Sequence, residues 1–515
     1  MSPPTRHRPV PTPPASPPAR NLYGRLWRWH FFAALIVIPF VLWQSVTGTL
    51  YLWSEWWMDA THPELRFVRP QREPLPVSMQ IGAALKFAAV TAGMAAPPSA
   101  AAAAAASAAA PPSAAAASTA TPPPAGAPPE QGPDQHSPTA PTTQAPLAAP
   151  PSNHEGHEHH QQGHHSTAAP PTGLAVERVL LPTDPSRTTA VLLKSSSSAL
   201  PYPIFVDPYT GTVLGQLSGA AWLPGISRAL HGGWPLGESG SWLLELGDGW
   251  AIFMLATGLY LWWPRGRGIA ALWPRTRAGK RVLLRDLHSC VAAWFAVIFL
   301  FFLISALPWT SFWGGTLLRT IETNTGQSSP VGFSPGGASL AQFSNAAQPI
   351  EQAVAAARQA GVRGMLDVRL APWGGAPLFM TNTGVLPSQD RTIVADPAAG
   401  AIRGVYTNGD LPVIPRLVAL GIHVHQADFG PVNVWLNTAF AASLMWLTVT
   451  GVLSWWNRRP AGKVGAPPKV KSGIPTAIRA MVVTACVLMP LFGASVLLIV
   501  MAEAVFRSGP VPAEL

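Results

Sequence analysis

The chain has 515 residues; 48% of them are hydrophobic, only 11% are Asp, Glu, Lys or Arg, and the net charge is +10. Soluble domains carry about 25% charged residues, so this composition excludes an ordinary soluble enzyme and favours a membrane protein. The two cysteines, Cys290 and Cys486, lie in apolar runs, which argues against a disulfide framework and against a cysteine-based zinc site.

Five apolar stretches are long enough to cross a membrane, whose hydrocarbon core needs roughly 20 apolar residues. The first follows a Pro-rich leader and precedes no small-residue cleavage site, which predicts an anchor and not a signal peptide. The second carries Glu245 and Asp248 near its start. We expect no buried acidic pair, and therefore no ion path, in any span. The five stretches lie near residues 31–53, 243–263, 290–309, 432–456 and 474–504.

Half of the 34 Lys and Arg residues lie in three segments, residues 1–28, 265–287 and 458–473. Basic loops mark the cytoplasmic side of a membrane protein. We therefore expect the N-terminus in the cytoplasm, and the long segments 54–242 and 310–431, together with the C-terminus, on the outer side. This topology accounts for the positive net charge, so we expect no nucleic-acid partner. Trp residues at the span ends are typical of an interfacial aromatic belt.

The order of span, outer segment and span occurs twice along the chain. Thr257-Gly258 and Thr450-Gly451 lie 193 residues apart, and each pair is followed by two adjacent Trp residues. In both outer segments a helical stretch precedes short strands, and an Asp-Pro-x-x-Gly sequence supplies a turn between two of them. We expect one small α+β domain per copy, with helices near 77–92 and 348–359 and strands near 176–181, 188–194, 203–207, 366–370, 378–381 and 391–396.

A Pro/Ala/Ser-rich insert, residues 95–173, interrupts the first outer segment. Such a composition cannot bury apolar surface and predicts disorder. Six imidazoles in a flexible segment can bind Cu(II), Zn(II) or Ni(II). The insert therefore either captures metal ions or is low-complexity sequence whose affinity for metals is incidental. The six candidate metal ligands are His154, His157, His159, His160, His164 and His165.

Five histidines outside the insert lie at span ends. His30 and His288 occupy equivalent places at the inner face, and His231 precedes the second span at the outer face. His423 and His425 precede the fourth span, and an overlay of the two copies does not choose between them. Imidazoles on facing helices are axial ligands of haem b. The pattern predicts two haem b sites, one near each face; the alternative is that each histidine only caps a helix or lies at the interface.

The chain resembles the PepSY-associated transmembrane family, iron-regulated membrane proteins that include bacterial ferric-siderophore reductases. The resemblance covers residues 22–459 except the insert. It rests on WRWHFFAAL…VTGTLYLW, VDPYTGTVLG, LHGGWPLGESGSWL…TGLYLWWPR, RDLHSCVAAW and GIHVHQADFGPVN…VTGVLSWW. It implies an α-helical bundle in the bacterial inner membrane, with five transmembrane helices and two small α+β PepSY-like periplasmic domains. By motif, His30, His231 and His288 match family histidines, and His423 and His425 flank the fourth place.

The predicted domains alternate between the membrane and its two faces. Residues 1–28 form a disordered cytoplasmic leader and 507–515 a tail. The spans with their outer approaches are 29–56, 231–264, 288–310, 423–457 and 474–506; the periplasmic domains are 57–230, with the insert, and 311–422; the cytoplasmic loops are 265–287 and 458–473.

The resemblance implies an oxidoreductase that passes electrons through haem to a periplasmic ferric siderophore or similar chelate. The chain carries no GxGxxG unit after a strand and no P-loop, so no flavin or nicotinamide domain is evident. We therefore expect a cytoplasmic partner or a quinol as the electron donor, and the lipid bilayer as the surroundings. Two alternatives stay open. One is a non-enzymatic PepSY regulator or binder of a periplasmic peptidase or envelope partner; the other is a metal-handling membrane protein that uses the His-rich insert.

Overall fold

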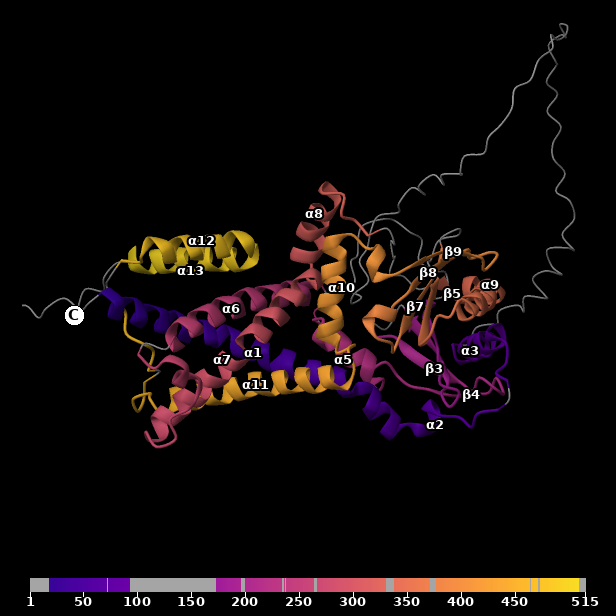
Figure 1. The fold of residues 1–515 in the computed structure, drawn as a ribbon, viewed down its shortest axis with the longest axis horizontal. Coiled ribbons are helices and arrows are strands. Elements are labelled where there is room, and N and C mark those ends of the chain that lie inside the picture. The colour runs from indigo at the N-terminus through magenta and orange to yellow at the C-terminus, as the bar shows by residue number, and fades with distance from the viewer. Residues whose placement is uncertain are drawn as a thin grey trace, which may run out of the picture.

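The computed structural model describes residues 18–71, 73–92, 173–195, 200–233, 236, 238–263, 266–329, 338–370, 377–463, 465–470 and 473–508. A helical bundle and a β-sheet lie end to end (Figure 1). The predictions for the first 17 residues, for the insert as far as residue 172 with its six histidines, and for the C-terminal tail from residue 509 onward fall outside the described residues. The predicted disorder of residues 18–28 is wrong, because helix α1 already begins at Pro18.

The bundle contains four long helices: α1 (Pro18–Thr61), α6 (Glu238–Trp262), α7 (Lys280–Ala306) and α11 (Pro431–Trp456). Its core is apolar and includes Ala33, Val37, Trp250, Phe299 and Phe440. Within the described part of the chain, three segments are long and apolar enough to cross a membrane, namely Leu22–Thr61, Lys280–Trp309 and Pro431–Trp456. Helix α6 packs along α1 and α7 and is not among these three segments; it carries three acidic residues, Glu238, Glu245 and Asp248.

The fifth predicted span is wrong as a single helix. The chain forms α12 (Thr476–Leu488) and α13 (Pro490–Ser508) instead, because Pro490 lacks an N–H and ends the preceding helix. A helix of 13 residues is about 20 Å long, too short for a hydrocarbon core of about 30 Å. The indole N–H of Trp313 donates to the Leu488 carbonyl at 3.1 Å and holds the tip of this hairpin against the bundle.

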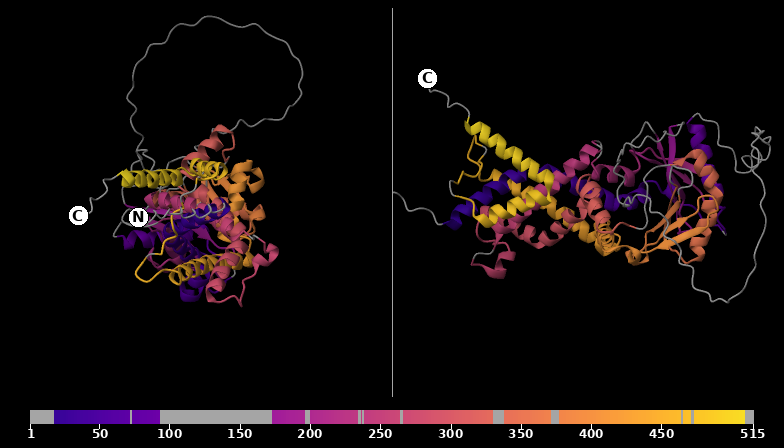
Figure 2. Two further views of the ribbon diagram at one scale, coloured as in Figure 1. Left: turned by 90° about the vertical axis from the view of Figure 1, so that its left-hand side faces the viewer. Right: turned by 90° about the horizontal axis from the view of Figure 1, so that it is seen from above.

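The hairpin also corrects the predicted position of the C-terminal helix. The start of α12 and the end of α13 both lie at the end of the bundle where α1 begins (Figure 2). Lys469, in the basic segment before α12, lies 3.8 Å from Glu503 near the end of α13. Helix α13 therefore returns to this basic end of the bundle and does not finish at the opposite end, which carries the sheet.

The strands of the two outer segments form one sheet, with the order β4-β3-β2-β1-β6-β7-β8-β9 and β5 beside β1. The expectation of two separate small domains is therefore corrected. β1 and β6 would each be an edge strand in its own copy, and their antiparallel pairing satisfies both edges. The strands are β1 (Leu174–Leu181), β2 (Thr189–Ser195), β3 (Tyr202–Val206), β4 (Val213–Gln216), β5 (Ala338–Ser339), β6 (Met365–Leu370), β7 (Leu378–Thr383), β8 (Thr392–Ala395) and β9 (Ile402–Tyr406).

The helices α3 (Val77–Thr91) and α9 (Leu340–Gln359) lie side by side against the sheet (Figure 1). Their apolar faces, including Ile81, Leu85, Phe343 and Ile350, are buried on strand residues such as Val179. The remaining short helices are α2 (Pro63–Arg66), α5 (Leu223–His231), α8 (Arg319–Asn324) and α10 (Val413–Gln426), with 3-10 or π turns η1 (Gly268–Leu272), η2 (Leu307–Trp309), η3 (Trp313–Leu318), η4 (Pro387–Gln389) and η5 (Asn408–Asp410).

The sheet is joined to the bundle by α5 and α10, which lie between them (Figure 1). Each follows the last strand of its own copy, and each carries histidines in its last turn. This arrangement brings histidines of the two outer segments to the sheet end of the bundle.

Candidate functional site

The two histidines expected at the inner face, His30 and His288, are called the inner histidines. Each is held by the Thr-Gly pair of the neighbouring helix. The Nδ1 atom of His30 lies 3.1 Å from both the Met254 carbonyl and the Thr257 hydroxyl oxygen. The Nδ1 atom of His288 lies 3.0 Å from the Leu447 carbonyl and 3.2 Å from the Thr450 hydroxyl oxygen. A carbonyl only accepts hydrogen bonds, so Nδ1 carries the proton in both rings. Each Nε2 therefore presents a lone pair, as in a histidine that binds a metal.

Glycines in the same pairs leave room for these rings. A Cβ atom at Gly258 would lie 3.1 Å from Cε1 of His30, and one at Gly451 would lie 3.4 Å from Cε1 of His288. The duplicated Thr-Gly sequence therefore has one role in both copies: it binds and accommodates the inner histidine of the adjacent helix. The repeat and the histidines are visible in the sequence, but the contacts between them run from one helix to another and are not.

The outer histidines, His231 and His425, are held in a similar way. Here α1 and α7, which carry His30 and His288, supply the hydroxyl groups instead of the histidines. Nδ1 of His231 lies 3.0 Å from the Thr47 hydroxyl, and Nδ1 of His425 lies 3.0 Å from the Ser305 hydroxyl. Both hydroxyls donate to carbonyls of their own helices, so they accept from the histidines and again fix the proton on Nδ1. Gly48 follows Thr47, and a Cβ atom there would lie 3.2 Å from Cε1 of His231.

The structure brings His425 and His231 together and places His423 elsewhere. The ring centroids of His231 and His425 are 6.1 Å apart. Both nitrogens of His423 instead lie 2.8 Å from carboxylate oxygens, Nε2 from Asp390 and Nδ1 from Asp428. Partial burial disfavours the charged ring, but hydrogen bonds and charge from the two carboxylates outweigh it and raise the pKa of His423 to about 9.

This ion pair predicts a pH-dependent stability. The folded-state pKa of His423 exceeds the usual value of 6.5, so its contribution is complete below about pH 6.5 and is lost as the pH rises through about 9. This contribution of His423 to the free energy of unfolding is about 3 kcal/mol. We expect the thermal unfolding midpoint of the wild type to fall more steeply over this range than that of His423→Gln. His62→Gln, at a half-buried site beside Glu64, is the control; equal profiles for wild type and His423→Gln would contradict the prediction.

A cavity lies between the bundle helices at the sheet end. His231 and His425 line it, together with apolar groups including Phe40, Phe299 and Phe440. Two imidazoles that bind one metal ion from opposite sides, with bonds of about 2 Å, have ring centroids about 6 Å apart, which is the observed separation. Free Nε2 atoms, apolar walls and a glycine against one ring all fit a haem at this place.

A bare metal ion fits the described residues less well than a haem. Structural and catalytic zinc sites take three or four ligands from the protein, and the described residues contain no group of three or more His, Cys, Asp or Glu side chains that could hold an ion. A bis-histidine haem needs only two protein ligands. Whether the insert histidines assemble such a group lies outside the described residues.

Helix α6 buries an acidic pair that was not predicted. Glu245 is 1% exposed and Asp248 is 4% exposed, against the expectation that no span buries such a pair. Their spacing of three residues, which places both on one face of a helix, was the available signal. Glu245 accepts hydrogen bonds from the Thr310 hydroxyl at 2.8 Å and from the Trp313 N–H at 2.9 Å, whereas Asp248 lines the cavity with His231 and His425.

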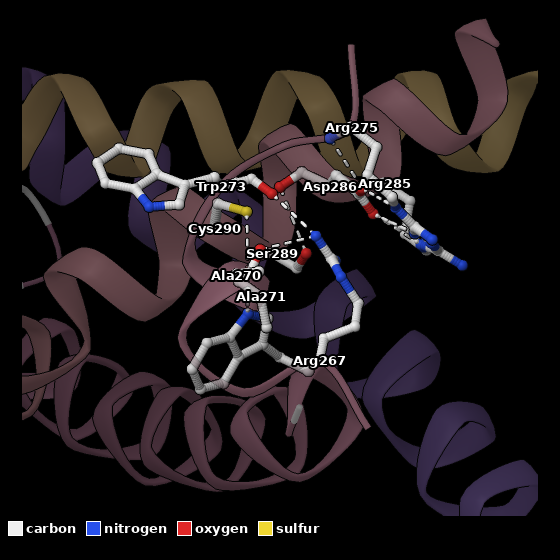
Figure 3. Close-up of polar contacts among 10 residues, drawn as sticks. Arg267, Ala270, Ala271, Trp273, Arg275, Arg285, Asp286, Ser289 and Cys290 are labelled. Atoms are coloured by element: carbon white, nitrogen blue, oxygen red, sulfur yellow. Dashed lines mark hydrogen bonds and ion pairs between the residues drawn. The ribbon is translucent and has the colours of Figure 1, made fainter. Parts of the chain in front are cut away.

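At the basic end, the loop before α7 is tied down two residues ahead of His288 (Figure 3). The guanidinium of Arg275 donates to both oxygens of the buried Asp286 at 2.7 and 3.0 Å. Cys290 is buried and its thiol donates to the Ala271 carbonyl at 3.4 Å, so its role here is packing. The basic loop is thus anchored on the helix that carries an inner histidine.

Comparison with known proteins identifies the family. The sequence profile of the PepSY-associated TM region matches residues 27–458, which include all five histidines and both copies of the repeat. No curated protein matches the chain.

Proposed function

This chain belongs to the family of PepSY-associated TM regions, and we propose that it is a haem b protein of the bacterial inner membrane. In this proposal, electrons cross the membrane and reduce a ferric chelate, such as a ferric siderophore, in the periplasm. The observation that carries the proposal is the set of histidines with protonated Nδ1 and free Nε2 at both ends of the bundle.

The distance between the two histidine levels supports a route across the membrane. Along α1, His30 and Thr47, the hydrogen-bond partner of His231, are 17 residues apart, about 25 Å at 1.5 Å per residue. A hydrocarbon core is about 30 Å thick. In this proposal the inner pair, His30 and His288, and the outer pair, His231 and His425, would lie near opposite faces, so that an electron would cross in one long step between two centres.

The protein residues would hold and tune the haems. Each bound haem would supply an iron that changes its charge by one electron. The carbonyls and hydroxyls at Nδ1 fix the tautomer and ring orientation of each ligand and raise its basicity. Apolar side chains such as Phe302, which lies 4.7 Å from the His425 ring between centroids, lower the local dielectric beside that ring.

The proposed reaction releases iron because Fe(II) binds hard oxygen donors more weakly than Fe(III). The sheet end of the bundle, which holds the outer pair, would face the periplasm, where the chelate arrives. The basic end would face the cytoplasm in agreement with its Arg and Lys content. The electron donor in this proposal is a cytoplasmic partner protein or a quinol.

A reduced-minus-oxidised absorption spectrum of the detergent-purified protein tests the proposal. We expect the spectrum of a bis-histidine b-type haem, two haems per chain, and reoxidation of the reduced protein by a ferric hydroxamate or catecholate chelate. Well-folded protein that contains no haem after expression in haem-replete cells would overturn the proposal. It would favour instead a PepSY domain protein that binds an envelope partner.

A further inference from the structure

Asp248 is a buried acid without a partner among the described residues. It is 4% exposed, and no hydrogen bond or ion pair joins it to another described side chain. A charged group within a transmembrane bundle is costly unless it is paired, and such a residue most often has a function. Its neighbour Glu245 differs, because Oε2 of Glu245 receives two hydrogen bonds from the turn after α7.

Two further polar atoms on the same cavity lack partners. The Gln44 side-chain oxygen Oε1 and the Ser45 hydroxyl are buried and form no hydrogen bond with described residues. Gln44, Ser45 and Asp248 all line the cavity that contains His231 and His425. Buried polar atoms are nearly always satisfied, by protein or by ordered water. The cavity wall therefore has the composition of a site for water molecules that reach a carboxyl group.

We propose that Asp248 takes up one proton when the outer histidine site receives an electron, and releases it when the electron leaves. This inference rests on the proposed function. One electron and one proton enter together, so the charge of the buried cavity does not change; the proton comes from periplasmic water through the waters held by Gln44 and Ser45. Charge neutralisation is favoured because a buried charge is screened weakly.

The other ionisable groups around the cavity are less suited to this exchange. Arg228 lines the same cavity, but a guanidinium does not lose its proton in proteins. The phenol of Tyr51 titrates near pH 10 when unperturbed. His231 and His425 keep Nδ1 protonated and commit Nε2 to the metal. Glu245 has one carboxylate oxygen held by two donors, which leaves Asp248 as the carboxyl group that is open to the cavity.

The proposal predicts a pH-dependent midpoint potential of the outer centre. Coupling of one proton to one electron lowers the potential by up to 59 mV for each tenfold fall in proton concentration. We expect a slope approaching this value over the pH range in which Asp248 exchanges its proton. The measurement is a redox titration at several pH values on the His288→Ala protein, in which only the outer haem remains.

In that background, Asp248→Asn is expected to keep the outer haem but to abolish most of the slope. Glu245→Gln is the matched control: it removes the other acid of the pair, preserves an oxygen that accepts from Thr310 and Trp313, and is expected to keep the slope. An unchanged slope in Asp248→Asn would overturn the inference. So would a midpoint potential that does not change with pH in the His288→Ala protein that retains Asp248. Absence of haem would overturn the proposed function instead.

A measurement on the unsubstituted side chain covers the case in which Asp248→Asn does not fold. The reduced-minus-oxidised infrared difference spectrum of the wild type should contain a C=O band of a protonated carboxylic acid that grows on reduction and shifts in D₂O. Asp248→Glu should move this band without removing it. Reduction of the haem without any such band would overturn the inference.

Discussion

Replacing His425 by Ala is expected to halve the haem content of the purified protein, whereas replacing His423 by Ala is expected to leave it unchanged. The two histidines are two residues apart on α10, but they face different surroundings. His425 lies opposite His231 across the cavity, at 6.1 Å between ring centroids. His423 has both nitrogens occupied by Asp390 and Asp428 and has none left for a metal.

The measurement is haem per chain from the absorbance of the extracted haem, together with the reduced-minus-oxidised spectrum. His423→Ala is the matched control, since it removes the same kind of side chain from the same helix. Loss of haem from His423→Ala with retention in His425→Ala would reverse the assignment. Loss of both haems from His425→Ala in a folded protein would argue against two separate sites.

Replacing Gly258 by Val is expected to remove the haem at the inner pair. Even a single Cβ atom at this position would lie 3.1 Å from Cε1 of His30, which already requires a small shift, and the two additional methyl groups of Val have no space. The His30 ring would turn away and lose its hydrogen bonds to Met254 and Thr257. We expect haem per chain to fall from two to about one, with the outer centre unchanged in spectrum and potential.

A graded series makes this prediction specific. Gly451→Ala places its Cβ at 3.4 Å from His288, an ordinary contact, and is expected to retain haem. Gly258→Ala should lower haem occupancy less than Gly258→Val. Gly82→Ala, in α3 with no atom near its Cβ position, controls for the effect of removing a helical glycine and should stabilise the fold by about 0.5–1 kcal/mol. Full haem content in Gly258→Val would contradict the proposed fit.

The repeat in the sequence predicted much of the candidate histidine site, because a repeat is recognised from residue spacing alone. It identified His30, His288 and His231 and the order of spans and outer segments. It did not choose between His423 and His425. That choice depends on Asp390, which lies 33 positions before His423 in sequence and reaches it only through the fold of the sheet. The Thr-Gly pairs were visible as a pattern, but their contacts run between helices.

Three further features of the fold depend on features of the chain that the periodicity of apolar residues in the sequence does not reveal. The apolar content of residues 474–504 is continuous, and only the position of Pro490 distinguishes a hairpin from one span. Pairing of β1 with β6 joins strands almost two hundred residues apart, so local patterns predicted two domains where one sheet forms. Glu245 and Asp248 were not expected to be buried as a pair. The turn at Thr310 supplies hydrogen-bond donors to Glu245, whereas Asp248 lies on the wall of the cavity; neither environment is visible in the local sequence.

The pairing of β1 with β6, through Val179 opposite Val368, has a consequence for the histidine sites. The strand order is the same when read outward from this pair in either direction, so the chain has the architecture of a two-fold symmetric dimer whose subunits have been joined end to end. In the proposed function each haem site would take one ligand from each subunit equivalent: His30 with His288, and His231 with His425. Neither half would form a complete site alone, and so the central strand pair and the metal sites would be assembled by the same association.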